Sequence, residues 1–303
     1  MIATKNRNIS LIGVPIQLGA DRPGVEMGPS AIRSSNLQAK LESLGYRVSD
    51  VGDVHVNRNI EACGPGEKLK YIAEIARVNT DLTARVSQEM AKGQLPLVLG
   101  GDHSLAIGTI KGVLQHVKKL GVIWFDAHAD VNTEETTMSG NIHGMSLAVL
   151  LGYGHHSLVS IAGEQTKVDP SKVVIIGARS VDPGERTFLR EQGIRVFTMH
   201  DIDRYGMKAV MDEALERVTT GTDGVHLSLD LDGMDPSAAP GVGTPVNGGL
   251  SYRESHFAME LLHESANLVS AEVVEVNPAL DVNNKTAQTA VELIGSLFGE
   301  SIM

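Results

Sequence analysis

The stretch Gly-Val-Ile-Trp-Phe-Asp-Ala-His-Ala-Asp at residues 121–130 decides the fold prediction. Its first five residues are apolar without alternation, which is typical of a strand that is covered on both faces. Its last five place Asp126, His128 and Asp130 on one side of an extended segment, because alternate side chains of a strand point the same way. Polar chemistry directly after an apolar strand is expected in an open parallel sheet, where function gathers beyond the carboxyl ends of the strands.

Similar apolar, β-branched runs recur along the chain, and helix-like segments separate them. The predicted strands are residues 9–14, 47–50, 95–99, 121–125, 172–176, 195–198, 225–231 and 268–276, and the predicted helices are residues 30–44, 68–92, 104–120, 184–192, 205–218, 251–264 and 286–297. This alternation predicts an α/β fold in which helices sandwich a parallel sheet. No linker, repeat or low-complexity tract divides the chain, so we expect residues 1–303 to form a single domain.

The composition limits the classes of function. The 303 residues include 26 Lys plus Arg and 37 Asp plus Glu, which gives a formal charge of −11. This balance excludes a non-specific nucleic-acid binder and is compatible with a cationic substrate. The single cysteine, Cys63, allows no internal disulfide and indicates a reducing compartment. No stretch approaches the length of a membrane span, and the apolar run at residues 9–16 is too short for a signal sequence. We therefore expect a cytoplasmic protein without a membrane partner.

Polar residues also follow two further predicted strands. Gly-Gly-Asp-His-Ser at residues 100–104 follows one, and Asp-Leu-Asp at residues 230–232 follows the other. Any one such segment is also typical of a solvated turn, but three together bring four carboxylates and two imidazoles to one sheet edge, where they would repel without cations between them. The six candidate ligands are His103, Asp126, His128, Asp130, Asp230 and Asp232. Oxygen and imidazole ligands favour Mn²⁺ or a similar ion, and six ligands suit two ions that share carboxylates and deprotonate a water. The pattern predicts a binuclear metallohydrolase.

The same segments resemble the signature motifs of a known family. Residues 100–104, 126–130 and 228–236 are similar to the three motifs of the ureohydrolase family, and residues 139–144, 243–246 and 275–278 resemble the arginases within it. The resemblance covers about residues 9–297. It implies a three-layer αβα sandwich with a central, mostly parallel sheet. It also implies two Mn²⁺ ions per subunit and the hydrolysis of L-arginine to L-ornithine and urea, by attack of a metal-bridging hydroxide on the guanidinium carbon.

The resemblance also implies roles for individual residues. One manganese would take His103, Asp126, Asp130 and Asp230, the second would take His128, Asp126, Asp230 and Asp232, and Asp130 would also hydrogen-bond the hydroxide. His143 resembles a proton shuttle to the leaving amine, and Glu275 resembles the carboxylate that orients the guanidinium. The expected substrate-binding residues are Asn132, Thr137, Ser139 and Asn141 for the α-carboxylate, Asp182 and Glu185 near the α-amine, and Thr244.

Each of these residues also has an explanation that involves no function. Glu275 could instead pair with a nearby Lys or Arg, His143 could be a packed loop residue, and acidic residues such as Asp182 and Glu185 are common where a helix begins.

Two departures from the arginase pattern leave the substrate open. Ser180 stands where many arginases carry Asp, and the loop at residues 133–138 is more acidic than carboxylate recognition needs. The alternatives are an agmatinase or another ureohydrolase for guanidino substrates, a single-metal deacetylase, and a non-catalytic metal-binding relative. The resemblance further implies a homotrimer or homohexamer, in which Arg253 would form an intersubunit salt bridge; an ion pair within one subunit is the alternative.

Overall fold

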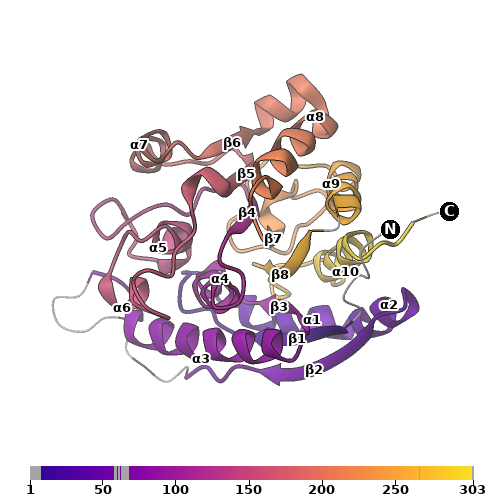
Figure 1. The fold of residues 1–303 in the computed structure, drawn as a ribbon, viewed down its shortest axis with the longest axis horizontal. Helices are drawn as coiled ribbons and strands as arrows, with labels where there is room; N and C mark the ends of the chain where they lie inside the picture. Colours follow the sequence, from indigo (N-terminus) through magenta and orange to yellow (C-terminus); the bar gives the residue numbers. More distant parts are fainter. Residues whose placement is uncertain (1–7, 58–59, 61, 63–67, 266, 302–303) are drawn as a thin grey trace.

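One parallel sheet organises the molecule. In this computed structural model the described residues are 8–57, 60, 62, 68–265 and 267–301, so Cys63 lies outside them. The strands are β1 (Asn8–Val14), β2 (Arg47–Asp53), β3 (Leu95–Gly100), β4 (Leu120–Phe125), β5 (Val173–Ala178), β6 (Arg195–Thr198), β7 (Gly224–Asp230) and β8 (Leu268–Val274). They lie in the order β2-β1-β3-β8-β7-β4-β5-β6, and every neighbouring pair is parallel (Figure 1). All eight predicted strands are present, and the predicted α/β fold is confirmed.

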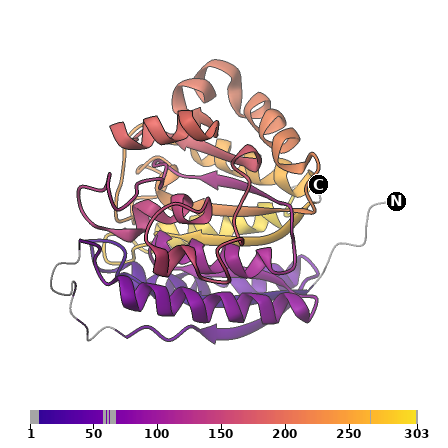
Figure 2. The same cartoon turned by 60° about the vertical axis from the view of Figure 1, so that its left-hand side comes forward.

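Helices cover both faces of this sheet and form a separate core on each. The first core packs against α1 (Gly28–Ser34), α2 (Leu37–Ser43), α8 (Met199–Thr219), α9 (Tyr252–Ser265) and α10 (Lys285–Leu297). The second packs against α3 (Ile72–Ala91), α4 (Ala106–Leu114), α5 (Ser146–Leu150), α6 (His156–Val159) and α7 (Pro183–Gln192). The turned view in Figure 2 shows the strands running between the two groups of helices. This is the expected three-layer αβα sandwich.

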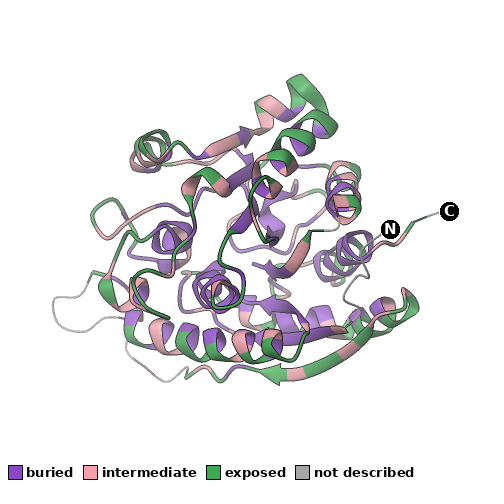
Figure 3. Cartoon of the chain, in the orientation of Figure 1, coloured by how far each residue is buried: buried purple, intermediate pink, exposed green. Residues whose placement is uncertain are grey.

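The apolar runs of the sequence are the central strands, which are buried along their length (Figure 3). Along β4, Ile123 and Phe125 face the first core, whereas Val122 and Trp124 face the second. Because both faces need apolar side chains, the strand shows no polar alternation. The edge strand β2 is mostly exposed, which is consistent with its shorter apolar pattern.

The helices differ more from the prediction than the strands do. The helix expected at residues 30–44 is two helices, because Asn36 adopts a left-handed backbone conformation with φ 65° and ends the first. The helix expected at 205–218 begins earlier, at Met199, and contains a kink at Gly206 (φ 79°). Two short helices, α5 and α6, were not predicted, since segments of five and four residues show no full helical period.

The order of the strands positions the site. β3, β8, β7 and β4 are consecutive neighbours in the middle of the sheet. Because these strands are parallel, their carboxyl ends meet at one edge, and the polar segments that follow them lie close together. The sequence separates these segments by up to about 170 residues, but the sheet makes them adjacent.

Candidate metal centre and substrate cavity

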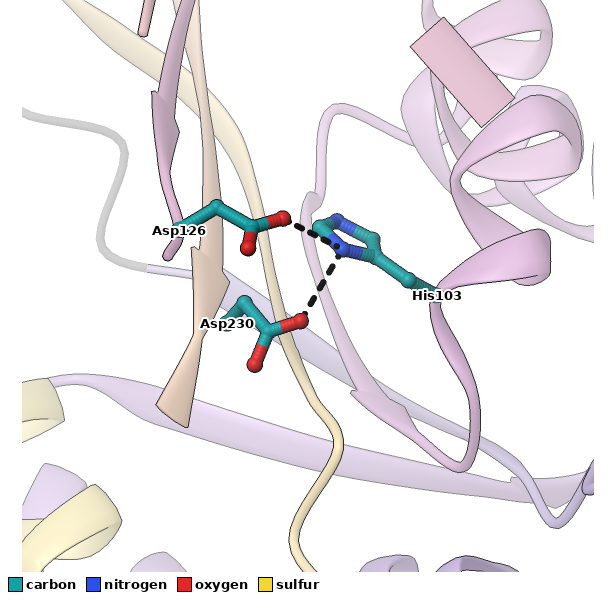
Figure 4. Close-up of side chains that lie close together, drawn as sticks. All are labelled: His103, Asp126 and Asp230. Atoms are coloured by element: carbon teal, nitrogen blue, oxygen red, sulfur yellow. Dashed lines mark ion pairs between the residues drawn. The ribbon is translucent and has the colours of Figure 1, made fainter. Parts of the chain in front are cut away.

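His103 lies at the centre of a cluster of carboxylates. It is the first residue of a short 3₁₀ helix (His103–Leu105) directly after β3, and its side chain is buried. Its Nδ1 atom lies 3.3 Å from Asp126 Oδ2, 3.1 Å from Asp130 Oδ2 and 3.2 Å from Asp230 Oδ2. Figure 4 shows the ring pointing at the carboxylates that follow β4 and end β7. His103, Asp126 and Asp230 offer ligand atoms that all lie within 4.8 Å of one another.

A second cluster shares Asp126 with the first. His128 Nδ1 lies 3.4 Å from Asp126 Oδ1 and 3.1 Å from Asp232 Oδ2, and these three residues also form a group with ligand atoms within 4.8 Å. Since one Asp126 oxygen faces His103 and the other faces His128, this carboxylate lies between the two clusters. The structure thus brings all six candidate ligands together in two groups joined by a bridging side chain.

A hydrogen-bonded chain fixes the orientation of His103. Ser228 Oγ donates to Glu272 Oε1 at 2.7 Å, and His103 Nε2 lies 2.7 Å from the same Ser228 oxygen. The hydroxyl has only one proton, which it gives to Glu272, so it must accept the other bond from the Nε2–H group of His103. Nδ1 is therefore the nitrogen that faces the carboxylates. All three side chains are buried.

The donor set fits a metal ion. His103 Nδ1 is buried and has no hydrogen-bond partner of adequate geometry among the described residues, although three carboxylate oxygens surround it. Carboxylates only accept hydrogen bonds, so either a proton or a metal ion must stand between them and this nitrogen. His103 Nδ1 lies at similar distances from three carboxylate oxygens, and its N–H direction would point straight at none of them. This arrangement suits a metal ion between the four atoms better than a hydrogen bond to one oxygen. The described donors are oxygens and imidazoles without a thiolate among them, and such a donor set suits a harder divalent ion better than the usual structural zinc site.

The electrostatics of the cluster show the same demand for positive charge. Burial of Asp130 and repulsion from Asp126 raise the pKa of Asp130 to about 6. Burial of His128 opposes its protonation, but Asp232 and Asp126 outweigh that effect and raise the pKa of His128 to about 12. The carboxylates thus attract a cation strongly to the position that His128 faces.

Two site residues adopt left-handed backbone conformations that are rare without glycine. Asp130 has φ 54° and Glu275 has φ 64°. The backbone carbonyl of Asp130 accepts bonds from Leu147 and Ala148 at the start of α5, and the Glu275 amide donates to Gly101 O. Such conformations cost of order 1–3 kcal/mol each, and they persist where surrounding contacts enforce them. Here they turn both carboxylates toward the cluster.

His143 and Glu275 lie together beside the first cluster. Glu275 Oε1 accepts from the backbone amide of His103 at 2.9 Å and lies 3.2 Å from His143 Nδ1. Burial of His143 opposes its protonation, but Glu275 raises its pKa to about 9. Glu275 Oε2 is buried without a hydrogen-bond partner among the described residues. The alternative prediction for Glu275 was an ion pair with a nearby Lys or Arg. No Lys or Arg is paired with Glu275 in the described part of the chain.

A cavity of about 150 Å³ opens onto these clusters. It is lined by His128, Asp130, Asn132, Thr137, Ser139, Asn141, His143, Gly144, Ser180, Asp182, Glu185, Asp230, Asp232 and Thr244. All seven predicted substrate-binding residues are among them, whereas Glu275, His103 and Asp126 are not among the lining residues. A larger cavity of about 630 Å³, between α7 and the beginning of α8, contains none of the predicted site residues and has a more apolar lining. The smaller cavity is therefore the one that brings the predicted site residues together.

The acidic residues that line the cavity, Asp182 and Glu185, also form hydrogen bonds that hold the surrounding backbone and side chains. Glu185 Oε2 accepts from the Asp182 amide at the start of α7, and Glu185 Oε1 accepts from the Val131 amide. Asp182 Oδ2 accepts from Asn132 Nδ2 at 3.1 Å. Asp182 and Glu185 thus stabilise the beginning of α7, as expected for acidic residues where a helix begins. The same two residues line the cavity. Burial raises the pKa of Glu185 to about 7.

Sequence reasoning missed several residues that hold the ligands in place. The ring of Trp124 stacks on His103 at 4.1 Å between centroids, and its Nε1 donates to Asp126 Oδ2 at 2.9 Å. The guanidinium of Arg179 donates to five backbone carbonyls, among them that of Asp232 at 2.7 Å. Ser228 and Glu272, which orient His103, could have been found from the sequence. Both are polar residues at alternate positions within strands that are otherwise apolar.

Comparisons with known proteins agree with this site. A family model described as "Arginase family" matches residues 7–299. The chain belongs to the arginase family. It is 56% identical to the arginase of Bacillus caldovelox over 296 residues, which cover 97% of this chain and 99% of the relative.

Solved structures of arginase-family members have the same fold. The crystal structure of arginase from Bacillus cereus is 57% identical with a TM-score of 0.93, and covers 98% of this chain and 100% of its own. The structure of Entamoeba histolytica arginase in complex with L-ornithine is 34% identical with a TM-score of 0.90, and covers 97% and 99%. These findings confirm the resemblance predicted from the sequence motifs.

Proposed function

We propose that this protein is a manganese-dependent arginase that hydrolyses L-arginine to L-ornithine and urea, with residues 1–303 as a single catalytic domain. The observation that carries the proposal is the pair of His–Asp clusters joined by Asp126 at the end of a polar cavity. Support comes from the family and from relatives named arginase that match nearly the full chain. The L-ornithine in the Entamoeba histolytica structure is the expected product.

We assign the first manganese to His103, Asp126, Asp130 and Asp230, and the second to His128, Asp126, Asp230 and Asp232. When bound, two such ions lower the pKa of water and so supply hydroxide near neutral pH. Asp126 faces both histidines, which supports its role as a shared ligand. The oxygen-rich donor set with two imidazoles supports Mn²⁺ or a similar divalent ion, and the resemblance to arginases favours Mn²⁺ among them.

The protein's own groups then act on substrate and protons. Asp130 lines the cavity beside the first cluster and would accept a hydrogen bond from the attacking water or hydroxide. His143 also lines the cavity, and its imidazolium, favoured by Glu275, can deliver a proton to the leaving amine. Glu275 Oε2 has a free acceptor position for a guanidinium N–H group, which would stand in for the missing partner.

Recognition of the amino-acid end requires donors for a carboxylate and acceptors for an ammonium group. Asn132, Ser139, Asn141 and Thr137 provide hydroxyl and amide donors in the cavity lining, and Asp182 and Glu185 provide carboxylates there. Thr244 donates to Asp232 Oδ2 at 2.8 Å, so its hydroxyl helps to orient a candidate metal ligand at the cavity wall.

An assay with two substrates tests the proposal. Purified protein is incubated with and without Mn²⁺, and urea release is measured from L-arginine and from agmatine, which lacks the α-carboxylate. We expect urea from L-arginine and about two manganese ions per chain by elemental analysis. Activity on agmatine alone would replace arginine by agmatine as the substrate, and the position of Ser180 in the cavity wall makes this the relevant competitor. No urea from any guanidine after metal loading would instead identify a non-catalytic relative.

We further propose a cytoplasmic homotrimer or homohexamer. In the described part of the chain no helix has the length and apolar character needed to cross a membrane. Arg253 forms a bidentate pair with Glu260 of the same chain (2.7 and 2.9 Å) and is largely exposed. Sedimentation of wild type and Arg253→Ala measures whether this residue also contributes to assembly.

A further inference from the structure

Lys70 contacts the wall of the substrate cavity from outside. Its Nζ atom donates to Asn141 Oδ1 at 2.8 Å and to Asp21 Oδ1 at 2.6 Å. Asn141 lines the cavity, but Lys70 and Asp21 do not. A lysine that reaches a cavity residue from behind can control what that residue presents to the substrate.

The chemistry of the two groups decides which atom faces the cavity. An ammonium group has three donors and no acceptor, whereas a side-chain amide has an acceptor oxygen and a donor NH₂ group on opposite sides. Lys70 can therefore bind only the oxygen of Asn141. The NH₂ group has two hydrogens, of which one serves Asp21 and the other is left for a group in the cavity. An α-carboxylate only accepts hydrogen bonds, so this orientation is the one that suits it.

The loop that carries Asn141 is anchored to the same segment at two further points. Lys68 Nζ donates to the carbonyl of Glu134 at 2.7 Å, and the Lys70 amide donates to the carbonyl of Gly140 at 3.0 Å. Gly140 has φ 76°, and a Cβ atom there would lie 2.3 Å from the carbonyl of Lys68. The backbone of the loop that carries Asn141 therefore packs closely against residues 68–70 at Gly140, where a side chain would not fit.

Asp21 balances the charge of Lys70. Hydrogen bonds from Lys70 and Asn141 lower the pKa of Asp21, which keeps this carboxylate ionised at neutral pH. The pair is therefore close to neutral, and it acts on the substrate through the direction of the Asn141 amide rather than through a net positive charge.

We propose that Lys70 is a positioning residue for substrate specificity, which holds the Asn141 amide so that its NH₂ group donates to the α-carboxylate of an amino-acid substrate. The inference rests on the proposed arginase function. This orientation of the Asn141 amide favours substrates with an α-carboxylate over guanidines without one.

The test compares Lys70→Met with wild type as manganese-loaded enzymes. Methionine keeps the length of the stem but removes the donors. We expect KM for L-arginine to rise about tenfold, the equivalent of one hydrogen bond to a charged group, with kcat within about twofold. The inhibition constant of agmatine against L-arginine should stay unchanged, because agmatine has no carboxylate. Lys70→Arg should restore most of the affinity. The control is Lys208→Met, which removes an exposed lysine paired with Asp212 on α8.

The outcomes are distinguishable. An unchanged KM for L-arginine in Lys70→Met would overturn the inference, and so would an equal rise of KM and of the agmatine inhibition constant, since that indicates a collapsed loop. If Lys70→Met does not fold, Asn141→Asp carries the same test, because it replaces the donor by an acceptor and should weaken L-arginine binding but not agmatine binding. Failure of the proposed function looks different: wild type itself would release no urea from L-arginine.

Discussion

Replacing Glu272 by glutamine removes a buried negative charge that acts on the candidate ligand His103 through one hydroxyl group. Glu272 is fully buried on β8, and Ser228 on β7 lies between it and His103. Glutamine has almost the same volume, so no cavity forms, and its oxygen can still accept from Ser228. What changes is the charge at the end of the chain.

The expected size follows from the two hydrogen bonds of 2.7 Å each. A bond to a charged group contributes about 1.5–3 kcal/mol, and a neutral one about 0.5–1.5 kcal/mol. The difference of about 1–2 kcal/mol corresponds to a loss of about 5- to 30-fold in metal affinity, within the range known for groups that orient ligating histidines. The affected ion is the one held by His103.

The metal-free form provides a second readout. Burial of Glu272 opposes its ionisation, but His226, with its Nε2 3.5 Å away, and His103 outweigh that effect and lower the pKa of Glu272. A carboxyl group with a lowered pKa in the folded chain contributes stability at neutral pH, so Glu272→Gln should also lower the unfolding free energy of the metal-free protein. A purely structural role for Glu272 predicts this loss of stability with an unchanged affinity for Mn²⁺.

The assay is calorimetric titration of metal-free protein with Mn²⁺, combined with thermal unfolding followed by circular dichroism. Glu89→Gln is the matched control, because Glu89 is a buried carboxylate that accepts from Ser10 at 2.6 Å near the beginning of β1, away from the carboxyl ends of the strands. We expect weaker Mn²⁺ binding for Glu272→Gln and no change for the control. Manganese affinity within twofold of wild type for Glu272→Gln would refute the reasoning.

Three further predictions concern other groups. His143→Asn should lower kcat by about 10²–10⁴-fold while elemental analysis still finds about two metal ions, and loss of metal would contradict the shuttle role. Asp232→Ala should lower occupancy of the ion at His128 and cut turnover strongly; full metal content with normal turnover would show that Asp232 is not a ligand. Burial lowers the pKa of Lys111, which donates to the carbonyls of Val159 and Thr166, to about 8. Between pH 8 and 10.5 the unfolded chain therefore binds a proton that folded Lys111 has released, so the unfolding free energy should rise with pH by up to about 3 kcal/mol, and Lys111→Met should lack this rise in denaturant titrations.

The strands and the six candidate ligands were predictable because one physical fact produces both. A strand buried on both faces must be apolar throughout, so β3, β4 and β7 stand out in the sequence. Their parallel arrangement then brings whatever follows them to one edge. Helix bounds were less predictable, since single residues such as Asn36 and Gly206 change the direction of the chain where tertiary contacts require it.

The conformation of individual site residues was not predictable from residue type. Glycine pairs are common where a turn needs positive φ, but neither Gly100 nor Gly101 adopts a positive φ. Gly101 is needed because a Cβ atom there would lie 1.8 Å from the carbonyl of Ile16. Positive φ occurs instead at Asp130 and Glu275, where sequence patterns give no reason to expect it.

The chain's acidic excess takes on a structural meaning in this fold. Below the cluster, the face of the sheet toward α4 carries His226 and Ser228 on β7 and Ser270 and Glu272 on β8, where other strands carry apolar residues. The carboxylates above and within this layer are buried, and the ion pairs that the described residues form with them come from imidazoles rather than from Lys or Arg. An imidazole balances a carboxylate only while it is protonated, and a metal-ligating imidazole is neutral. Two divalent ions would supply four positive charges at the place where the carboxylates repel each other most. The electrostatics of the fold therefore favour a metal centre, as the chemistry of the donor set does, and manganese binding should stabilise the folded chain by an amount that grows with the logarithm of its affinity.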